Sequence, residues 1–314
     1  MSNLHKLEDS KIFYEDRYQK GYMETWPKDK RDRVCEMVKS LPLPREGEAL
    51  DFGCGNGVFT RVLKEALPRW RVYGCDVSSA AVRNAAAKNP DCVFFTNGEA
   101  AFKDKKFDFI FSHHVLEHVF DVQDVASHMI EKSKDASSML HILPCGNPDS
   151  FEWRICNLRT DGINKNMGGR FFFEDEGHIR RLDTPSCSAL FSRTGFALAL
   201  AFYSNQYHGA LNWITRSHPF VIFTMFNPFK GKDVRAAARL FYYLAICLLI
   251  LALRLPVILY ERTDRRIFKI LLYLLSLLSL PVDAHMVAKS EDEFKKMKTE
   301  KNGSEMYLFF TKSK

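Results

Sequence analysis

The sequence predicts an α/β fold built on a mainly parallel sheet. Between about residue 45 and residue 203, short β-rich runs alternate with helical patterns, as in consecutive βαβ units. One of these runs, residues 49–53, leads directly into a glycine-rich turn and then a helical pattern. The composition, 314 residues with 46% hydrophobic and 26% charged, indicates one large domain or one domain plus an insertion, and excludes disordered and fibrous proteins.

The elements follow in order. Residues 1–44 are expected to form cap helices, with an amphipathic helix over 28–40 and an aromatic-rich lead before it (Phe13, Tyr14, Tyr18, Tyr22, Trp26). The predicted strands are 49–53, 71–76, 92–96, 107–112, 138–143 and 196–203. The predicted helices are 58–67, 79–88, 122–134 and 185–193. Ser78 is placed to cap the second of these helices, and Thr184 with Pro185 gives the start of the last one.

The stretch with the most chemical information is the turn from Asp51 to Gly57, Asp-Phe-Gly-Cys-Gly-Asn-Gly. Glycine permits a positive φ in such a turn and lets the backbone approach a ligand at the start of the next helix. A dinucleotide-binding turn would place its third glycine at position 58, where this chain has Val58. The spacing therefore favours a different small-molecule cofactor.

Over residues 49–203 the chain resembles class I S-adenosylmethionine-dependent methyltransferases. The turn with Asp51, Gly53 and Gly55 resembles the family's first motif, and Phe107-Asp-Phe-Ile its fourth-strand motif. The resemblance implies a Rossmann-like seven-stranded methyltransferase sheet with helices on both faces, and S-adenosyl-L-methionine as the cofactor. A closing strand at 306–312 would complete that sheet.

The resemblance also implies roles for individual residues. The glycine backbone would lie against the methionine part of the cofactor, and Asp51 would help to hold the turn and the amino group. Asp76 would accept hydrogen bonds from both ribose hydroxyls, which suits an ionised carboxylate because it offers only acceptors. Glu99 would take the exocyclic amine of adenine, and Ala100 would border the ring.

Two further segments bear on the identity of the methyl acceptor. Ser112 to His118 resembles the Val-Leu-Glu-His-Val element of small-molecule and quinone-precursor O-methyltransferases, some of which hold a metal with Glu-x-x-Glu-His. Here His114 replaces the first glutamate, which removes a charge from a hard-cation site, so we predict no metal and a loop-stabilising role for Glu117 and His118. His178 lies in a segment resembling the His-x-Arg element of cell-envelope glycan and lipid methyltransferases.

Three histidines, His113, His114 and His178, are candidates for a general base, because a near-neutral pKa suits removal of a hydroxyl proton. Each of them is alternatively a structural residue. Nucleic-acid acceptors are not expected, since no Asn/Asp-Pro-Pro-aromatic motif follows the fourth strand and no RNA-binding module is present. Cys145 and the other cysteines form no CxxC pair, and we expect them to be reduced.

Residues 207–300 form a basic and apolar insertion before the last strand, residues 301–314. From residue 207 to residue 270 there are ten basic and three acidic side chains, which equals the net charge of +7 of the whole chain. The charge-free runs 240–253 and 270–282 are shorter than the roughly twenty residues of a spanning helix. We expect a hairpin that lies on or dips into an anionic membrane surface, and the alternative is a homodimer interface.

The first twenty residues contain no apolar stretch of the kind found in secretory signals, so we expect a cytoplasmic protein, peripheral or monotopic on the inner membrane face. The function that we predict is S-adenosylmethionine-dependent O-methylation of a lipid, prenylated or lipid-linked acceptor. Two alternatives stay open. One is a soluble small-molecule or sugar methyltransferase that dimerises through the hairpin, and the other is a non-catalytic cofactor-binding subunit.

Overall fold

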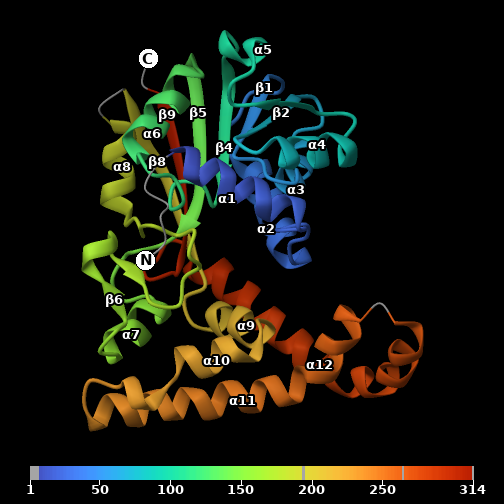
Figure 1. The fold of residues 1–314 in the computed structure, drawn as a ribbon, viewed down its shortest axis with the longest axis vertical. Coiled ribbons are helices and arrows are strands. Elements are labelled where there is room, and N and C mark those ends of the chain that lie inside the picture. The colour runs from blue at the N-terminus through green and yellow to red at the C-terminus, as the bar shows by residue number, and fades with distance from the viewer. Residues whose placement is uncertain (1–6, 193–194, 264, 313–314) are drawn as a thin grey trace.

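The computed structural model describes residues 7–192, 195–263 and 265–312, and a seven-stranded mixed sheet lies at its centre (Figure 1). The strand order is β3-β2-β1-β4-β5-β9-β8. The first five strands are parallel, whereas β9 runs antiparallel between β5 and β8. The strands are β1 (Glu48–Phe52), β2 (Arg71–Asp76), β3 (Val93–Thr96), β4 (Phe107–His113), β5 (Ser133–Pro144), β8 (Phe196–Ser204) and β9 (Glu305–Lys312). The predicted sheet and its closing strand are confirmed.

Two hydrophobic cores cover the two faces of this sheet. On one face α2 (Lys28–Ser40) and α3 (Val58–Ala66) pack on side chains such as Phe109 and Ile142. On the other face α5 (Ala100–Lys103), α6 (Val122–Glu131) and α8 (Thr184–Ser192) pack on residues such as Ile110 and Leu143. Neighbouring residues of a strand point to opposite faces, so Phe109 and Ile110 serve different cores. The helix α4 (Ser79–Lys88) begins at Ser78, whose Oγ accepts from Ala81 N as predicted.

Several predicted boundaries differ from the structure. The helix expected over 122–134 ends at Glu131, because Ser133 already pairs with Phe107 in the ladder between β4 and β5. Residues 145–183, which connect β5 to α8, contain regular elements. These are α7 (Phe151–Leu158), β6 (Ile163–Asn164), η1 (Lys165–Met167) and β7 (Arg170–Phe171). Part of the aromatic lead folds as α1 (Leu7–Gln19), whereas Tyr22 and Trp26 lie in the segment between α1 and α2. Residue 193, the expected end of the helix 185–193, lies outside the described residues.

The insertion forms a helical layer with a third hydrophobic core. Its elements are α9 (His208–Arg216), α10 (Pro219–Met225), η2 (Pro228–Lys230), α11 (Val234–Arg262) and α12 (Arg266–Met297). It leaves the sheet after Ser204 and returns at Glu305, and these two residues pair with each other. On its other side Glu305 pairs with Pro144 at the end of β5. The insertion therefore sits at the edge where the parallel strands end, as Figure 1 shows.

The two apolar runs lie inside helices much longer than the runs themselves. The helix α11 has 29 residues and α12 has 32, because charged and amphipathic segments extend both runs. By length and composition both helices could cross a membrane. The expectation that these segments are too short to span was therefore wrong, because it counted only the charge-free runs and not the whole helices. How far the two helices can enter a membrane depends on the contacts that hold them to the rest of the domain.

Candidate active site

A cavity of about 660 Å³ opens at the carboxyl ends of β1, β2 and β4. Its floor is the glycine turn after β1, where Gly53, Gly55 and Gly57 have φ values of +76°, +51° and +77°. A Cβ at Gly53 would lie 2.5 Å from Val115 Cγ2, so only glycine fits the turn at this point. The volume suits a cofactor and part of a second substrate.

Two of the three acidic residues expected at the cofactor site, Asp51 and Asp76, line this cavity and are buried. Asp76 accepts Gly55 N on one carboxylate oxygen and Ser78 N on the other, each at 2.9 Å, which leaves further lone pairs toward the cavity. Asp51 accepts from Thr60 Oγ1 at 2.6 Å, and burial raises its pKa to about 7. Asp51 thus fixes the turn to α3, while Asp76 ties the turn to the next strand.

The loop after β3 is placed differently from the expectation. Asn97 and Gly98 line the cavity, but neither Glu99 nor Ala100 is among the described lining residues. The Glu99 carboxylate turns back onto its own loop and accepts from Thr96 N at 2.9 Å and Thr96 Oγ1 at 2.8 Å. In this arrangement Glu99 stabilises the loop, and its role toward adenine stays a prediction.

The helix α1 and the segment after it form a wall of the cavity, a role that was not predicted from the sequence. Tyr14 and Tyr18 of α1 line it, as do Tyr22 and Trp26 in the segment that follows. The four residues recur every four positions, which places Tyr14 and Tyr18 on one face of α1. Two tethers hold the wall in place: the Glu15 carboxylate accepts from Ser78 Oγ and Ala80 N at the start of α4, and Arg17 donates two hydrogen bonds to Asp175. In addition, Asn56 of the glycine turn donates to Tyr22 O at 2.7 Å.

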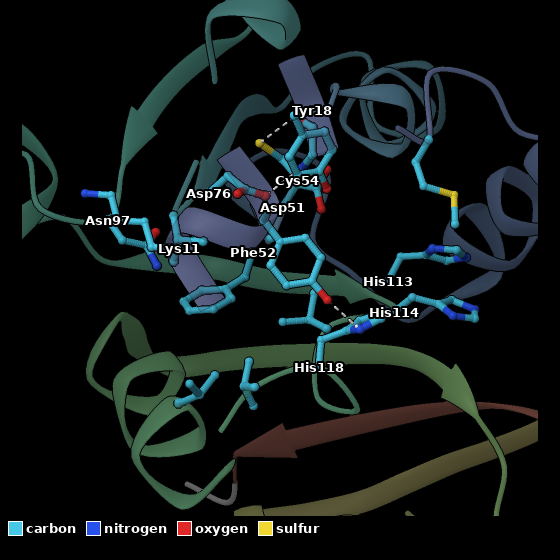
Figure 2. A pocket seen from close by; sticks show the side chains of 18 of the residues that line it. Lys11, Tyr18, Asp51, Phe52, Cys54, Asp76, Asn97, His113, His114 and His118 are labelled. Atoms are coloured by element: carbon cyan, nitrogen blue, oxygen red, sulfur yellow. Dashed lines mark hydrogen bonds between the residues drawn. The ribbon is translucent and has the colours of Figure 1, made fainter. Parts of the chain in front are cut away.

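His113 and His114, at the end of β4, both line the cavity at the end away from Asp76 (Figure 2). His114 is clamped between two carboxylates, with Nδ1 3.0 Å from Glu117 and Nε2 3.1 Å from Glu305, and they raise its pKa to about 9. His113 stacks on Phe59, and its Nε2 has no hydrogen-bond partner within the described part of the chain. Burial holds the pKa of His113 well below its usual value, so at neutral pH it is uncharged whereas His114 is an imidazolium.

His178 and His118 lie beside this pair in different positions. His118 lines the cavity, and its Nδ1 is 2.8 Å from Tyr14 Oη. His178 packs edge-on against His118 but is not among the described lining residues, and its Nδ1 is 3.5 Å from Glu174. Of the three candidate bases, the structure therefore brings His113 and His114 to the cavity and leaves His178 behind its wall. The acidic partners Glu117 and Glu305 complete the cluster, and Glu305 was not predicted because no motif in the sequence includes it.

Two sets of potential metal ligands arise from this cluster, His113 with His114 and Glu305, and His114 with Glu117 and His178. Both sets require His114. Since each of its ring nitrogens faces a carboxylate, the protonated ring has no lone pair to offer a cation. The charge pattern accounts for the cluster without a metal, and the absence of one stays a prediction.

Behind the cavity, Arg181 links four segments of the chain. Its guanidinium donates to Glu152 at 2.6 Å and to Glu174 at 2.7 Å. It also donates to the carbonyl oxygens of Cys145 and Ser304, at the end of β5 and just before β9. Cys145 is buried, and burial together with its apolar surroundings fits the structural role expected for it. This network joins the segment 145–183 to the sheet edge next to the histidines.

A comparison with protein-family models decides the family. Residues 20–200, more than half of the chain, match the model described as "Methyltransferase domain". The chain belongs to this methyltransferase family. The predicted resemblance to class I S-adenosylmethionine-dependent methyltransferases is thereby confirmed.

Curated relatives of the methyltransferase match only part of its chain. A trans-aconitate 2-methyltransferase of Escherichia coli O17:K52:H18 is 28% identical over 119 residues, 38% of this chain and 46% of that protein. One from Variovorax paradoxus is 31% identical over 96 residues, 30% of this chain and 37% of that protein. The chain thus spans less than half the length of these relatives.

Solved structures that match the chain do so at low sequence identity. A putative sarcosine dimethylglycine methyltransferase from Galdieria sulphuraria has a TM-score of 0.46 and 13% identity, and the match covers 97% of this chain and 98% of that one. A putative methyltransferase from Haloferax volcanii, in complex with an activator, has a TM-score of 0.44 and 17% identity, covering 62% and 80% of the two chains.

The cavity of this methyltransferase fits S-adenosylmethionine, the cofactor of the family. Asp76 offers free lone pairs to vicinal hydroxyls, and the glycine turn presents backbone without side chains. Asn97 and Gly98 border the end of the cavity where the base would lie. The residues that would hold the cofactor are therefore Asp51, Gly53, Gly55 and Asp76, joined by Asn97 and Gly98.

Proposed function

We propose that the protein transfers the methyl group of S-adenosylmethionine to a hydroxyl of a lipid, prenylated or lipid-linked acceptor at the cytoplasmic face of a membrane. The proposal rests on one observation, that the cofactor cavity and the apolar insertion lie at the same edge of the sheet. The cofactor cavity opens where β1, β2 and β4 end, and the apolar insertion is attached at the same edge, between Ser204 and Glu305. A membrane bound by the insertion would face the side of the molecule from which an acceptor enters.

The outer surface of the insertion is apolar to a degree that a water-exposed surface rarely is. Large apolar side chains are exposed on α10, α11 and α12. On α12 they point in nearly all directions around the helix, which is typical of a helix that is covered by an apolar environment. These side chains are Ile267, Phe268, Ile270, Leu271, Tyr273, Leu274, Leu275, Leu277, Leu278 and Leu280.

Positive charge surrounds this apolar surface. Arg262, Arg265, Arg266 and Lys269 are exposed at the junction of α11 and α12. Basic residues beside an apolar helix face suit an anionic headgroup layer, while the apolar side chains enter the acyl boundary. This combination favours a membrane over a second protein copy as the occupant.

A buried arginine limits how deeply the hairpin can enter. Arg254 of α11 is fully buried and donates to Asp283 of α12, and to Asn212 and Thr215 of α9. The end of α11 is also held to α9, because Arg216 of α9 donates to Glu261. With α11 tied to the domain at both points and cations at the tip of the hairpin, we expect the hairpin to lie along the membrane surface and not to cross it.

The chemistry at the acceptor end follows from the two adjacent histidines. When bound, S-adenosylmethionine supplies a methyl group on a sulfonium that an acceptor oxygen attacks. The oxygen becomes strongly acidic as it is methylated, so even a weak neutral base such as His113 can take its proton. His114 is already protonated between Glu117 and Glu305 and cannot accept one, which assigns it to holding the loop.

The first test is transfer of label. The full chain is incubated with methyl-labelled S-adenosylmethionine and a total lipid extract, and the organic and aqueous phases are separated. We expect label in the organic phase only with active protein, and mass spectrometry then identifies the product. Label confined to the aqueous phase would indicate a soluble acceptor. No transfer despite cofactor binding would indicate a non-catalytic subunit.

Membrane docking is tested separately by sedimentation with vesicles of phosphatidylcholine and phosphatidylglycerol in a three-to-one ratio. The variant carries serine at Leu271, Leu274 and Leu278, which are 65%, 70% and 78% exposed. A matched control carries serine at the exposed Ile12, Val93 and Leu200 of the methyltransferase domain. We expect the first variant to stay in the supernatant and the control to sediment like wild type. Equal sedimentation of both variants would reject the docking surface, and a change of oligomeric state in the first variant alone would support the dimer.

A further inference from the structure

The charges and walls of the cavity point to a substrate class, an inference that rests on the proposed methyl transfer. We propose that the acceptor compartment takes an uncharged, flat and largely apolar group that bears the reacting hydroxyl, and that it rejects polycarboxylates. This compartment is the end of the cavity lined by Tyr22, Met23, Trp26, His113 and His114.

The first argument is the charge of the lining. Among the described lining residues Lys11 is the single lysine and no arginine occurs, whereas Asp51, Asp76, Asp121 and Asp124 are acidic. The positive charge of His114 is balanced by Glu117 and Glu305, and the nearby Lys30 is itself paired with Glu305. A buried carboxylate needs a partner that offsets its loss of hydration, most effectively a cation. Among its described residues the compartment offers no cation that lacks a carboxylate partner, so an anionic acceptor would be bound at a cost.

The second argument is the nature of the walls. Trp26 lies edge-on to His113 with 4.7 Å between ring centroids, and His113 stacks on Phe59 at 3.8 Å. Rings that line a site favour other flat groups through stacking and burial of apolar surface. Within this stack, Nε2 of the uncharged His113 is buried and has no hydrogen-bond partner among the described residues. A neutral imidazole nitrogen in apolar surroundings suits a neutral hydroxyl better than a carboxylate.

This inference separates the protein from the relatives that it matches in sequence. Those relatives are named as methyltransferases of trans-aconitate, a molecule with three carboxylates. The match with them spans less than half of either protein, so the shared part need not include the acceptor compartment. The charges of the lining described above are the reason for expecting a different acceptor here.

The test compares two probes of one shape and different charge. The full chain is titrated by calorimetry with 4-hexylphenol, 4-hexylbenzoate and trans-aconitate, with and without S-adenosylhomocysteine. We expect 4-hexylphenol to bind at least tenfold more tightly than 4-hexylbenzoate, and trans-aconitate to give no saturable heat. Trp26→Ala should weaken 4-hexylphenol at least fivefold, whereas Phe229→Ala, at a 96% exposed ring of the insertion, should not.

A gain-of-function variant keeps the test independent of any loss of folding. Met23 lines the compartment and is 43% exposed, so Met23→Lys adds a cation at low structural cost. It should tighten 4-hexylbenzoate at least fivefold. Equal or tighter binding of 4-hexylbenzoate or trans-aconitate by the wild type would overturn the inference. Failure of S-adenosylhomocysteine to bind would instead contradict the proposed function. The two failures can be distinguished, because the ratio of the probe affinities is also measured without S-adenosylhomocysteine.

Discussion

Nε2 of His114 lies 3.1 Å from Oε1 of Glu305, although 191 positions separate the two residues in the chain. His114 has a positive φ of +54° at the end of β4, and Glu305 is the first residue of β9. The contact exists because β9 enters the sheet beside β5, with Glu305 opposite Pro144. It joins the acceptor end of the cavity to the point where the insertion returns to the sheet.

This contact predicts a pH dependence of stability. The folded-state pKa of His114, about 9, exceeds the usual value near 6.5, so the stabilisation is fully present below pH 6.5 and is lost as the pH rises through 9. We expect His114→Gln to lower the unfolding free energy by roughly 2–3 kcal/mol at pH 6 and by much less at pH 10. Urea unfolding at several pH values measures this, and an equal loss at both pH values would contradict it.

The glycine turn gives a second prediction, with a control inside the same cavity. Gly53→Ala forces a positive φ on alanine and a contact with Val115, so it should cost about 1–3 kcal/mol of stability. It should also weaken S-adenosylhomocysteine binding, because the turn must shift. Gly98→Ala meets no atom within 4 Å and should stay within about 0.5 kcal/mol of wild type. Thermal unfolding distinguishes the two, and similar losses for both would refute this reading of the turn.

Asp76 is expected to carry much of the cofactor affinity. Asp76→Ala removes charge-assisted acceptors for the ribose and leaves Gly55 N and Ser78 N without their carboxylate, which should weaken binding by about 1.5–3 kcal/mol. Calorimetry with S-adenosylhomocysteine measures the change. Glu99→Gln is the comparison, because its carboxylate bonds to Thr96 rather than facing the cavity, and it should have a smaller effect. An unchanged affinity of the Asp76 variant would remove this residue from the site.

Arg181 is predicted to stabilise the fold far more than a surface arginine does. Arg181→Met leaves Glu152 and Glu174 buried without their partner and should cost about 3–5 kcal/mol. Arg61 pairs with Glu65 and Asp91 on the surface, so Arg61→Met should cost less than about 1 kcal/mol. Denaturation midpoints of both variants provide the measurement, and comparable losses would show that the buried network contributes little.

The local features of the fold followed from the sequence because they depend on neighbouring residues. Short β-rich runs marked the strands, and the glycines after Asp51 marked a turn that needs positive φ, which the structure shows at Gly53 and Gly55. Ser78 could be assigned as a helix cap because its partner, Ala81, is three residues away. Boundaries shifted where a strand pairing competed with a helix, as at Ser133.

The acceptor end of the cavity was decided by the tertiary structure. The sequence indicated His113, His114 and His178 alike, but only the placement of β9 beside β5 and of α1 over the cavity separates an uncharged His113, a clamped His114 and a His178 behind the wall. Likewise the apolar runs indicated an insertion, whereas the contacts of Arg254 with α9, which hold α11 to the domain, follow only from the tertiary structure. Local patterns encode periodicity and turn chemistry, while contacts across a hundred or more positions arise from sheet order, which no short pattern contains.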